Sequence, residues 1–218
     1  VMSDSESSNI TSTNTITAIV LASGLGSRFG GKKLLHKLII NDKPPLALGV
    51  ISALNVKPFV DHVICIVQPE DKVLKQQFEF HDFTTVDNPD FKQGLSSSIK
   101  AGIRFCQNNY KYASSNHYMI CLADMPYIEA NTYKAVTKQF KARIKTHANT
   151  IIRPVLTDNK KAGHPVIFSN KFETELLNLS GDDGGKPIIK QHGFDSVIVD
   201  DAGVLTDIDR KTDIHKQG

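Results

Sequence analysis

The chain of 218 residues has no tryptophan, only three cysteines, and no hydrophobic run close to the ~20 residues that a membrane-spanning helix needs. We therefore expect a soluble, cytoplasmic protein with no membrane partner. Three cysteines cannot all pair, and no C-x-x-C spacing occurs, which argues against a disulfide framework or a zinc site. Cys65 and Cys121 lie in apolar runs typical of buried free thiols.

The chain also lacks a dense block of lysine and arginine. Its 26 basic and 23 acidic residues leave a formal net charge of +3. This charge predicts no nucleic-acid surface. The first residues, 1–14, are rich in serine, threonine and asparagine without an apolar centre, so we expect a disordered polar extension rather than a signal peptide. Residues 15–218 contain no long linker or repeat, which favours a single domain.

Apolar runs and helical patterns alternate along that domain. This alternation predicts an α/β fold of three layers, with a mostly parallel sheet covered by helices on both faces. The expected strands are Ile16–Leu21, His62–Val67, Thr84–Val86, Tyr118–Leu122, Thr150–Pro154, Pro165–Phe168 and Ser196–Val199. The expected helices are Pro45–Leu54, Asp71–Phe80, Ser96–Cys106, Asn131–Ile144 and Lys171–Leu179.

A glycine-rich segment, from Leu21 to Lys33, follows the first strand directly. Glycines let backbone N–H groups approach phosphate oxygens, and its arginine and lysine would offset their charge. Two common phosphate loops do not fit. Phe29 stands where G-x-G-x-x-G needs its third glycine, and Lys33 replaces the hydroxyl residue that ends the P-loop pattern G-x-x-x-x-G-K-[ST].

The pattern that does fit is L-A-x-G-x-x-x-R-x-G-x-x-K, and it resembles the signature loop of the MobA-like nucleotidyltransferases. The alternative is an ordinary glycine-rich turn with solvated cations. The resemblance implies a Rossmann-like nucleotidyltransferase fold and a loop that holds a nucleoside triphosphate. The implied nucleotide-binding residues of the loop are Leu21, Ala22, Ser23, Gly24, Gly26, Arg28 and Lys33.

Asp124 follows another expected strand, in the segment L-A-D-M-P. Ligands of open α/β sheets bind beyond the carboxyl ends of strands, where a carboxylate can hold magnesium against phosphate oxygens. Asp124 could instead cap the following turn. The segment resembles that of the cytidylyltransferase branch of the family, in which the aspartate is a metal ligand.

A serine-rich helix start, Gly94 to Gly102, is similar to a family element beside the nucleotide, with Gly94 and Ser98 at the matching positions. Spare N-cap serines are the alternative reading. Further on, G-H-P-V-I-F and S-G-D-D-G resemble acceptor-side motifs, which assigns His164 and Asp182 to acceptor binding. A structural histidine and a polar turn are the alternatives.

The segment Thr206 to Asp213 stands where the family reads D-I-D-T-P-x-D. Asp207 and Asp209 would point to one side if the segment is extended. We expect Asp209 rather than Asp207 to be the second metal ligand opposite Asp124. Arg210 and Lys211 replace the family's Thr-Pro, so the turn that follows is not defined by the motif.

These motifs together resemble the molybdenum cofactor cytidylyltransferase group most closely. The implied reaction is the Mg²⁺-dependent transfer of a nucleotidyl group to the terminal phosphate of molybdopterin, with release of pyrophosphate. Arg28, Lys33 and Asp124 would be the catalytic residues, acting by positioning and charge neutralisation. A molybdenum enzyme is a possible client partner.

The base is inferred from Ser23, and the L-A-D-M-P segment agrees with that inference. Cytosine-specific members read L-A-A-G and guanine-specific ones L-A-G-G, and Ser23 resembles the alanine form because it has a Cβ. CTP is therefore favoured over GTP. The rival functions are a guanylyltransferase, a sugar- or alditol-phosphate nucleotidyltransferase and a non-catalytic nucleotide-binding partner of a molybdenum enzyme.

Overall fold

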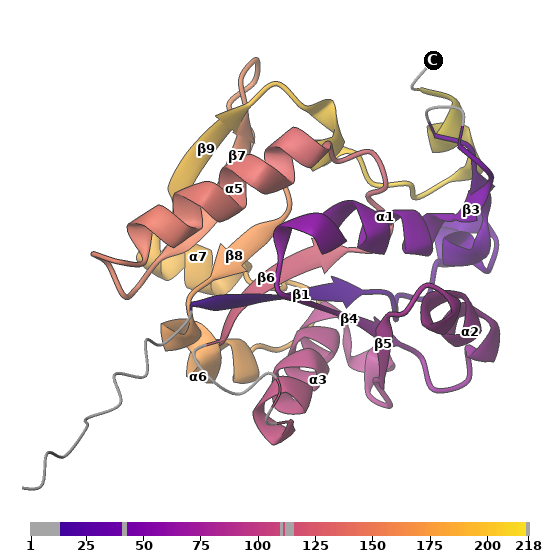
Figure 1. Cartoon of the computed structure of the whole chain (residues 1–218). Coiled ribbons are helices and arrows are strands. Elements are labelled where there is room, and N and C mark those ends of the chain that lie inside the picture. Colours follow the sequence, from indigo (N-terminus) through magenta and orange to yellow (C-terminus); the bar gives the residue numbers. More distant parts are fainter. Residues whose placement is uncertain (1–13, 41–42, 110, 112–115, 217–218) are drawn as a thin grey trace, which may run out of the picture.

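A seven-stranded sheet forms the centre of the computed structural model, which describes residues 14–40, 43–109, 111 and 116–216 (Figure 1). Its strand order is β5-β4-β1-β6-β8-β7-β9. The strands are β1 (Thr15–Leu21), β4 (His62–Val67), β5 (Thr84–Asp87), β6 (Asn116–Leu122), β7 (Ile151–Leu156), β8 (Val166–Phe168) and β9 (Asp195–Val199). Every neighbouring pair is parallel except the two that involve β8. The mostly parallel sheet is confirmed; the expected disorder of the amino-terminal extension falls almost entirely on residues 1–13, outside the described residues.

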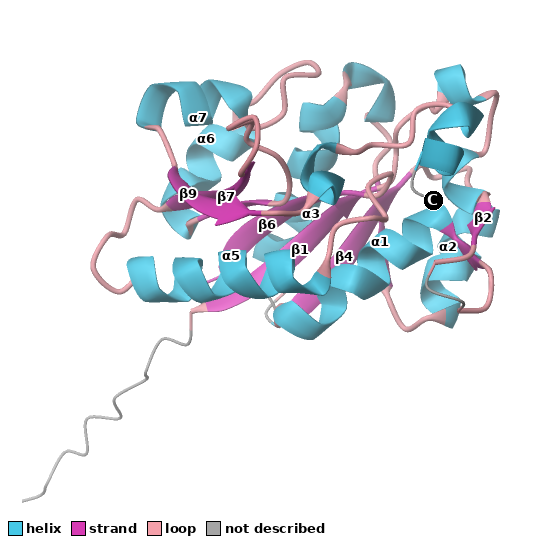
Figure 2. Cartoon of the chain, turned by 90° about the horizontal axis from the view of Figure 1, so that it is seen from above, coloured by secondary structure: helices cyan, strands magenta, loops and turns pink. Residues whose placement is uncertain are grey.

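Helices cover both faces of this sheet, which confirms the three-layer architecture (Figures 1 and 2). Buried apolar residues of α1 (Leu48–Val56), α2 (Lys72–Phe80) and α5 (Ala130–Arg143) contribute to one core cluster. Those of α3 (Leu95–Asn108), α6 (Glu173–Leu177) and α7 (Lys186–His192) belong to a second. The sheet separates the two clusters.

The alternation along β1 shows how one strand feeds both cores. Ile16, Ala18 and Val20 belong to the cluster with α1, α2 and α5, whereas Ile19 and Leu21 belong to the cluster with α3. Successive side chains of a strand point to opposite faces, so a strand covered on both faces reads as one continuous apolar run. That is why the strands were recognisable from the sequence.

Two helix predictions differ from the structure. The helix expected at Pro45–Leu54 begins at Leu48, because β3 (Leu46–Ala47) pairs antiparallel with β2 (Lys37–Leu38). The helix expected at Lys171–Leu179 is a 3₁₀ turn, Asn170–Phe172, followed by α6. The sequence analysis did not predict α7. This helix is short, follows two glycines and starts with Lys186-Pro187, a sequence that suggests a turn. Proline is nevertheless tolerated in the first turn of a helix.

The antiparallel direction of β8 decides which loops meet at one edge. The carboxyl ends of β1, β4, β5, β6, β7 and β9 lie together, and β8 begins at that same edge. The segment before β8 therefore faces the loops that follow the other strands. Within the described part of the chain, no helix is long and apolar enough to cross a bilayer.

Candidate active site

The loop after β1 is anchored by an apolar side chain in its middle. Two short 3₁₀ turns, Ser27–Phe29 and Lys33–Leu35, shape it, with Gly26 and Gly30 in the left-handed conformation. Phe29 is buried in a third cluster, which also contains Ile208. Burial of Phe29 fixes the loop while its neighbour Arg28 stays exposed. Phe29, which stands where the dinucleotide-binding pattern needs a glycine, thus has a packing role.

The carboxyl-terminal segment returns to this loop through backbone contacts. The Ile208 N–H donates to the Asp124 carbonyl at 2.9 Å, and the buried Ile208 side chain joins Phe29. Asp213 Oδ2 then accepts from the N–H groups of Asp209 and Arg210, at 3.1 and 2.7 Å. These hydrogen bonds form the turn at Arg210 and Lys211, which the sequence motif did not define.

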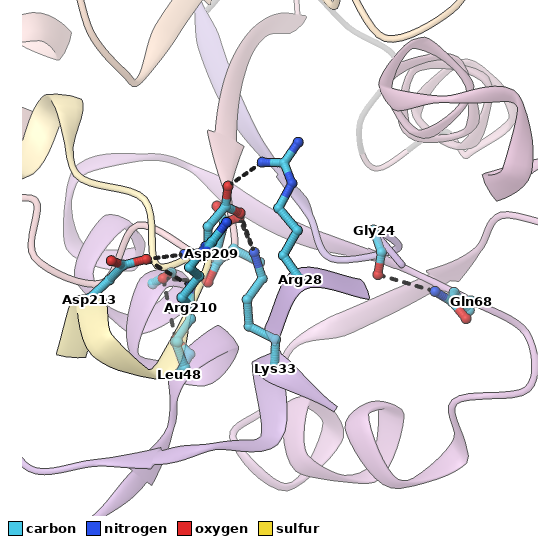
Figure 3. A network of polar contacts seen from close by, with 11 residues as sticks. Gly24, Arg28, Lys33, Leu48, Gln68, Asp209, Arg210 and Asp213 are labelled. Atoms are coloured by element: carbon cyan, nitrogen blue, oxygen red, sulfur yellow. Dashed lines mark hydrogen bonds and ion pairs between the residues drawn. The ribbon is translucent and has the colours of Figure 1, made fainter. Parts of the chain in front are cut away.

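Four charged side chains meet where these segments join (Figure 3). The Lys33 Nζ lies 2.7 Å from Asp124 Oδ2 and 3.3 Å from Asp209 Oδ1. The Arg28 Nη1 lies 2.6 Å from Asp209 Oδ2. The Lys33 side chain is 11% exposed and that of Arg28 71%, so the lysine pairs are the better shielded from solvent.

The pKa values of two groups reflect this cluster. Burial lowers the pKa of Lys33, but the charges and hydrogen bonds of Asp124 and Asp209 outweigh burial, and that pKa is raised overall. Lys33 is therefore a permanent cation. Burial raises the pKa of Asp207, and the charges of Asp124 and Asp209 raise it further.

The three aspartates fit a divalent cation. Asp124, Asp207 and Asp209 each offer a carboxylate oxygen, and the three atoms lie within 4.8 Å of one another. Magnesium and manganese prefer oxygen ligands of this kind. The Lys33 ammonium already lies between Asp124 and Asp209 as a stand-in cation. The structure brings Asp207 into the cluster beside Asp209, so both candidates for the second ligand are present.

Ser23 takes part in a buried polar cluster beside this centre. Its Oγ lies 2.5 Å from Ser98 Oγ, at the start of α3. The Asn88 amide donates to Ser97 at 2.9 Å and to Ser98 at 3.1 Å. All four side chains are buried. The cluster ties the phosphate-loop start to α3, so the predicted nucleotide residues Ser23 and Ser98 do meet.

The start of α3 is also held from the other half of the chain. Asp182 Oδ1 accepts from the Leu95 N–H at 3.1 Å, and the Gly181 carbonyl accepts from the Ser96 N–H. Gly94 has φ +94°, and a Cβ there would lie 2.5 Å from Asp182 Oδ1. Asp182, which the sequence assigned to the acceptor, thus contacts the start of α3 directly.

Two pockets flank the loop. One, of about 380 Å³, is lined by Gly26, Lys32, Lys33, Gln68 and residues of the start of α2. The other, of about 290 Å³, is lined by Ser23, Gly94, Ser98, Lys92 and Asp182 among others. Leu21, Gly24, Leu25 and Asp124 line both. Asp124 therefore borders both pockets, and Lys33 borders the first, whose lining carries both lysines and carboxylates.

His164 lies at the same sheet edge, directly before β8, but lines neither of these two pockets. Its N–H donates to the Val204 carbonyl at 2.9 Å, and its peptide bond to Pro165 is cis. Among the described residues, its buried Nδ1 has no hydrogen-bond partner. Burial, and then the charge of Arg153, lower the pKa of His164 to about 4, so the imidazole is neutral at pH 7.

Two residues at the site were not predicted from the sequence. The Gln68 amide donates to the carbonyls of Ser23 and Gly24, at 3.0 and 3.2 Å, and Asn88 organises the buried serines. Gln68 directly follows β4 and Asn88 directly follows β5. The rule that ligands bind beyond the carboxyl ends of strands could have selected both residues.

Comparison with known proteins agrees with this arrangement. The family model for the MobA-like NTP transferase domain matches residues 18–197, and the chain belongs to this family of nucleotidyltransferases. A curated relative, the molybdenum cofactor cytidylyltransferase of Escherichia coli, is 23% identical over 202 residues, which cover 91% of this chain and 93% of the relative.

Solved structures share the fold. The structure of Rv0371c from Mycobacterium tuberculosis H37Rv superposes with a TM-score of 0.71 at 22% identity, covering 92% of this chain and 95% of that one. A complex of Rv0371c with manganese superposes with a TM-score of 0.60 at 18% identity, covering 85% and 87%. These identities are low, so the likeness defines the fold alone.

Proposed function

We propose that the protein transfers a nucleotidyl group from a nucleoside triphosphate, CTP in preference to GTP, to the terminal phosphate of a molybdopterin-type acceptor. The observation that carries this proposal is the meeting of Arg28 and Lys33 with Asp124 and Asp209, where Asp124 borders two pockets. Two phosphate-binding cations beside metal-binding carboxylates suit phosphoryl-type transfer. The name of the Escherichia coli relative supports the choice of acceptor.

The nucleotide fits across the loop. In our proposal the base and sugar occupy the pocket walled by Ser23, Gly94 and Ser98. The phosphates extend past Gly24 and Gly26 toward Lys33, with Leu21 and Ala22 forming the floor. The pocket between the loop and α3 is then closed at its inner end by the buried serine cluster.

The reaction needs no protein nucleophile. An oxygen of the acceptor phosphate attacks the α-phosphorus, the bond from that phosphorus to the bridging oxygen breaks, and its electron pair leaves with pyrophosphate. Arg28 and Lys33 offset the charge that develops on pyrophosphate, and Asp124 and Asp209 hold the cation site. Mg²⁺, if bound by these carboxylates, would supply positive charge that offsets the charge of the phosphates.

The preference for CTP rests on Ser23. In our proposal its Cβ takes up space that a larger base would need, and its buried hydroxyl pairs with that of Ser98 at 2.5 Å. A guanylyltransferase would need that space. We therefore favour cytosine and keep GTP as the rival.

The acceptor side is assigned to the edge where β8 begins. His164 is a neutral imidazole there, and Asp182 lies within the loop that reaches across to α3. We propose that these two residues border the acceptor, with Asp182 also fixing the nucleotide-side helix. A molybdenum enzyme that accepts the product is a possible client. Sugar- and alditol-phosphate acceptors, and a binding protein without turnover, are the other candidates.

A thermal-shift titration with CTP, GTP, ATP and UTP, each with and without magnesium, tests the nucleotide half. A ligand at one hundred times its dissociation constant adds about 2.7 kcal/mol of stability. We expect a magnesium-dependent shift with CTP. A shift with GTP alone would select the guanylyltransferase, and no shift with any triphosphate would contradict an enzyme of this family.

Pyrophosphate release then tests the acceptor half. The wild-type protein with magnesium and CTP should release pyrophosphate when molybdopterin is added, but not with an alditol phosphate or a sugar phosphate. Asp124→Asn is the matched control, because it removes a charge of the cation site while keeping the side chain's shape. Turnover with an alditol phosphate alone would overturn the choice of acceptor.

A further inference from the structure

Two cations of the loop, Arg28 and Lys33, are bonded to the carboxylates that the proposed function gives to the metal. The Lys33 ammonium contacts Asp124 and Asp209, and the Arg28 guanidinium contacts the second oxygen of Asp209 (Figure 3). Both of these cations therefore have carboxylate partners in this conformation. The loop itself thus partly neutralises the carboxylates of the site.

Of these two cations, Lys33 makes the ion pairs that are better shielded from solvent. Its ammonium is shared by two carboxylates at 2.7 and 3.3 Å, and its side chain is 11% exposed, whereas Arg28 is 71% exposed. Ion pairs shielded from solvent are stronger than exposed ones. An ammonium at this place meets the same oxygens that a divalent cation would use.

The charges of the cluster predict that either ligand alone binds weakly. Asp124, Asp207 and Asp209 face Lys33 and Arg28, which leaves one excess negative charge when all are ionised. A polyphosphate approaching this cluster meets carboxylates whose partner cations are already occupied. A divalent cation approaching it finds the Lys33 ammonium between two of its ligands.

We propose that Lys33 is a built-in occupant of the divalent-cation site, and that the metal and the polyphosphate bind by exchanging it. Entry of the metal releases the ammonium from Asp124 and Asp209, and the released ammonium turns to the phosphates. Each ligand therefore raises the affinity of the other, by the same factor in both directions. This inference rests on the proposed function for the identity of the two ligands.

The first test measures Mn²⁺ binding without any nucleotide, from the free-ion electron paramagnetic resonance signal. Lys33→Met, and Lys33→Gln as a second neutral variant, should bind Mn²⁺ about 5-fold or more tightly than wild type, because the competing ammonium is gone. Lys33→Arg keeps the charge and should stay near wild type. Lys32→Met changes a neighbouring exposed lysine and is the matched control.

The second test works in the opposite direction, with inorganic tripolyphosphate in the presence of EDTA. Asp124→Asn removes a Lys33 partner and should bind tripolyphosphate about 5-fold or more tightly than wild type. Asp207→Asn is the matched control, because it removes one negative charge from the same cluster but leaves the ion pairs of Lys33 with Asp124 and Asp209 intact. It should change the affinity for tripolyphosphate less than Asp124→Asn does.

Equal or weaker Mn²⁺ binding by Lys33→Met and Lys33→Gln would overturn the exchange. Absence of Mn²⁺ binding in all variants would overturn it together with the metal site of the proposed function. Tighter Mn²⁺ binding by the neutral variants, in a protein that releases no pyrophosphate from any triphosphate, supports the exchange while the proposed function fails.

Discussion

Phe29 and Ile208 pack in one apolar cluster, although one follows the first strand and the other lies near the carboxyl end of the chain. Each lies next to a charged residue of the site in the sequence, Phe29 next to Arg28 and Ile208 next to Asp209. Packing of Phe29 and Ile208 therefore positions the side chains of Arg28 and Asp209. The Arg28 to Asp209 contact of 2.6 Å spans 181 positions of sequence and depends on this packing.

Truncating Ile208 should thus affect activity more than its burial alone implies. Ile208→Ala should lower the free energy of unfolding by about 2–4 kcal/mol, as large-to-small core changes do. It should also raise the KM for the triphosphate, because the segment carrying Asp209 loses its anchor. Urea unfolding and steady-state kinetics measure the two effects.

Ile103→Ala is the matched control, since Ile103 is equally buried but packs in the core of the other sheet face. It should cost similar stability and leave the KM close to wild type. If both variants changed KM equally, the anchoring role of Ile208 would be wrong.

Gly94→Ala should damage the nucleotide side of the site. A Cβ at Gly94 would lie 2.5 Å from Asp182 Oδ1 and 2.7 Å from the Gly181 carbonyl oxygen, and its φ is +94°. We expect the free energy of unfolding to fall by about 3 kcal/mol or more, because backbone strain of about 1–3 kcal/mol adds to the cost of the steric clash. Chemical denaturation and a CTP thermal shift would measure it.

Gly193→Ala separates strain from collision. Gly193 has φ +74° at the end of α7, and no atom lies within 4 Å of the position that a Cβ would take there. Gly193→Ala should therefore lower the free energy of unfolding by the backbone strain alone and leave nucleotide binding unchanged. A Gly94→Ala protein as stable as Gly193→Ala would show that Asp182 and Gly181 move aside readily.

Ser23→Gly should relax base discrimination. Removing the Cβ opens the space that a guanine would need, so the ratio of kcat/KM for CTP over GTP should fall by about 10-fold, a typical value for one small group in a pocket. Ser98→Ala removes the hydroxyl partner but keeps the Cβ of Ser23, and should change the ratio less. An unchanged ratio in Ser23→Gly would remove Ser23 from base selection.

Stability should fall below neutral pH because of buried His117. Burial lowers the pKa of His117 to about 4, and its Nδ1 accepts from the Asn170 N–H at 3.1 Å, which requires the unprotonated ring atom. The unfolded chain takes up the proton near pH 6.5. Stability from this group is therefore complete above about pH 6.5 and is lost as the pH falls toward 4.

Urea unfolding at pH 7, 6 and 5 measures this effect. Between pH 6 and 5 the His117 contribution approaches about 1.4 kcal/mol per pH unit. His117→Gln should reduce this slope by about half, because buried His164, whose pKa is also lowered to about 4, contributes in the same pH range, and His147→Gln, at an exposed position, controls for the loss of an imidazole. A slope equal to wild type in His117→Gln would contradict the assignment.

The strands and the site-bearing loops could be predicted from the sequence because each depends on local patterns. Buried strands are continuous apolar runs, and residues that follow them reach one sheet edge, so Arg28, Lys33, Asp124 and Asp209 could be expected to lie near one another. The structure does bring them together. Their roles remain part of the proposed function.

What could not be predicted depends on contacts between distant segments. The start of α1 is shifted by a two-residue pairing of β2 with β3, which is too short to leave a periodic pattern. The contact of Asp182 with the Leu95 N–H joins two loops 87 positions apart. The sequence also offered no sign that Lys33 would bond the metal-type carboxylates themselves.

The direction of β1 has a practical consequence for handling the protein. Its amino end, at Thr15, lies at the edge of the sheet opposite the loops, whereas the carboxyl-terminal turn containing Asp209 and Asp213 forms part of the charged cluster. A fusion partner or surface anchor joined ahead of β1 keeps the reactive edge facing solution. A histidine tag joined after the last turn would add imidazoles beside the carboxylates and sequester the very ions that the binding assays titrate.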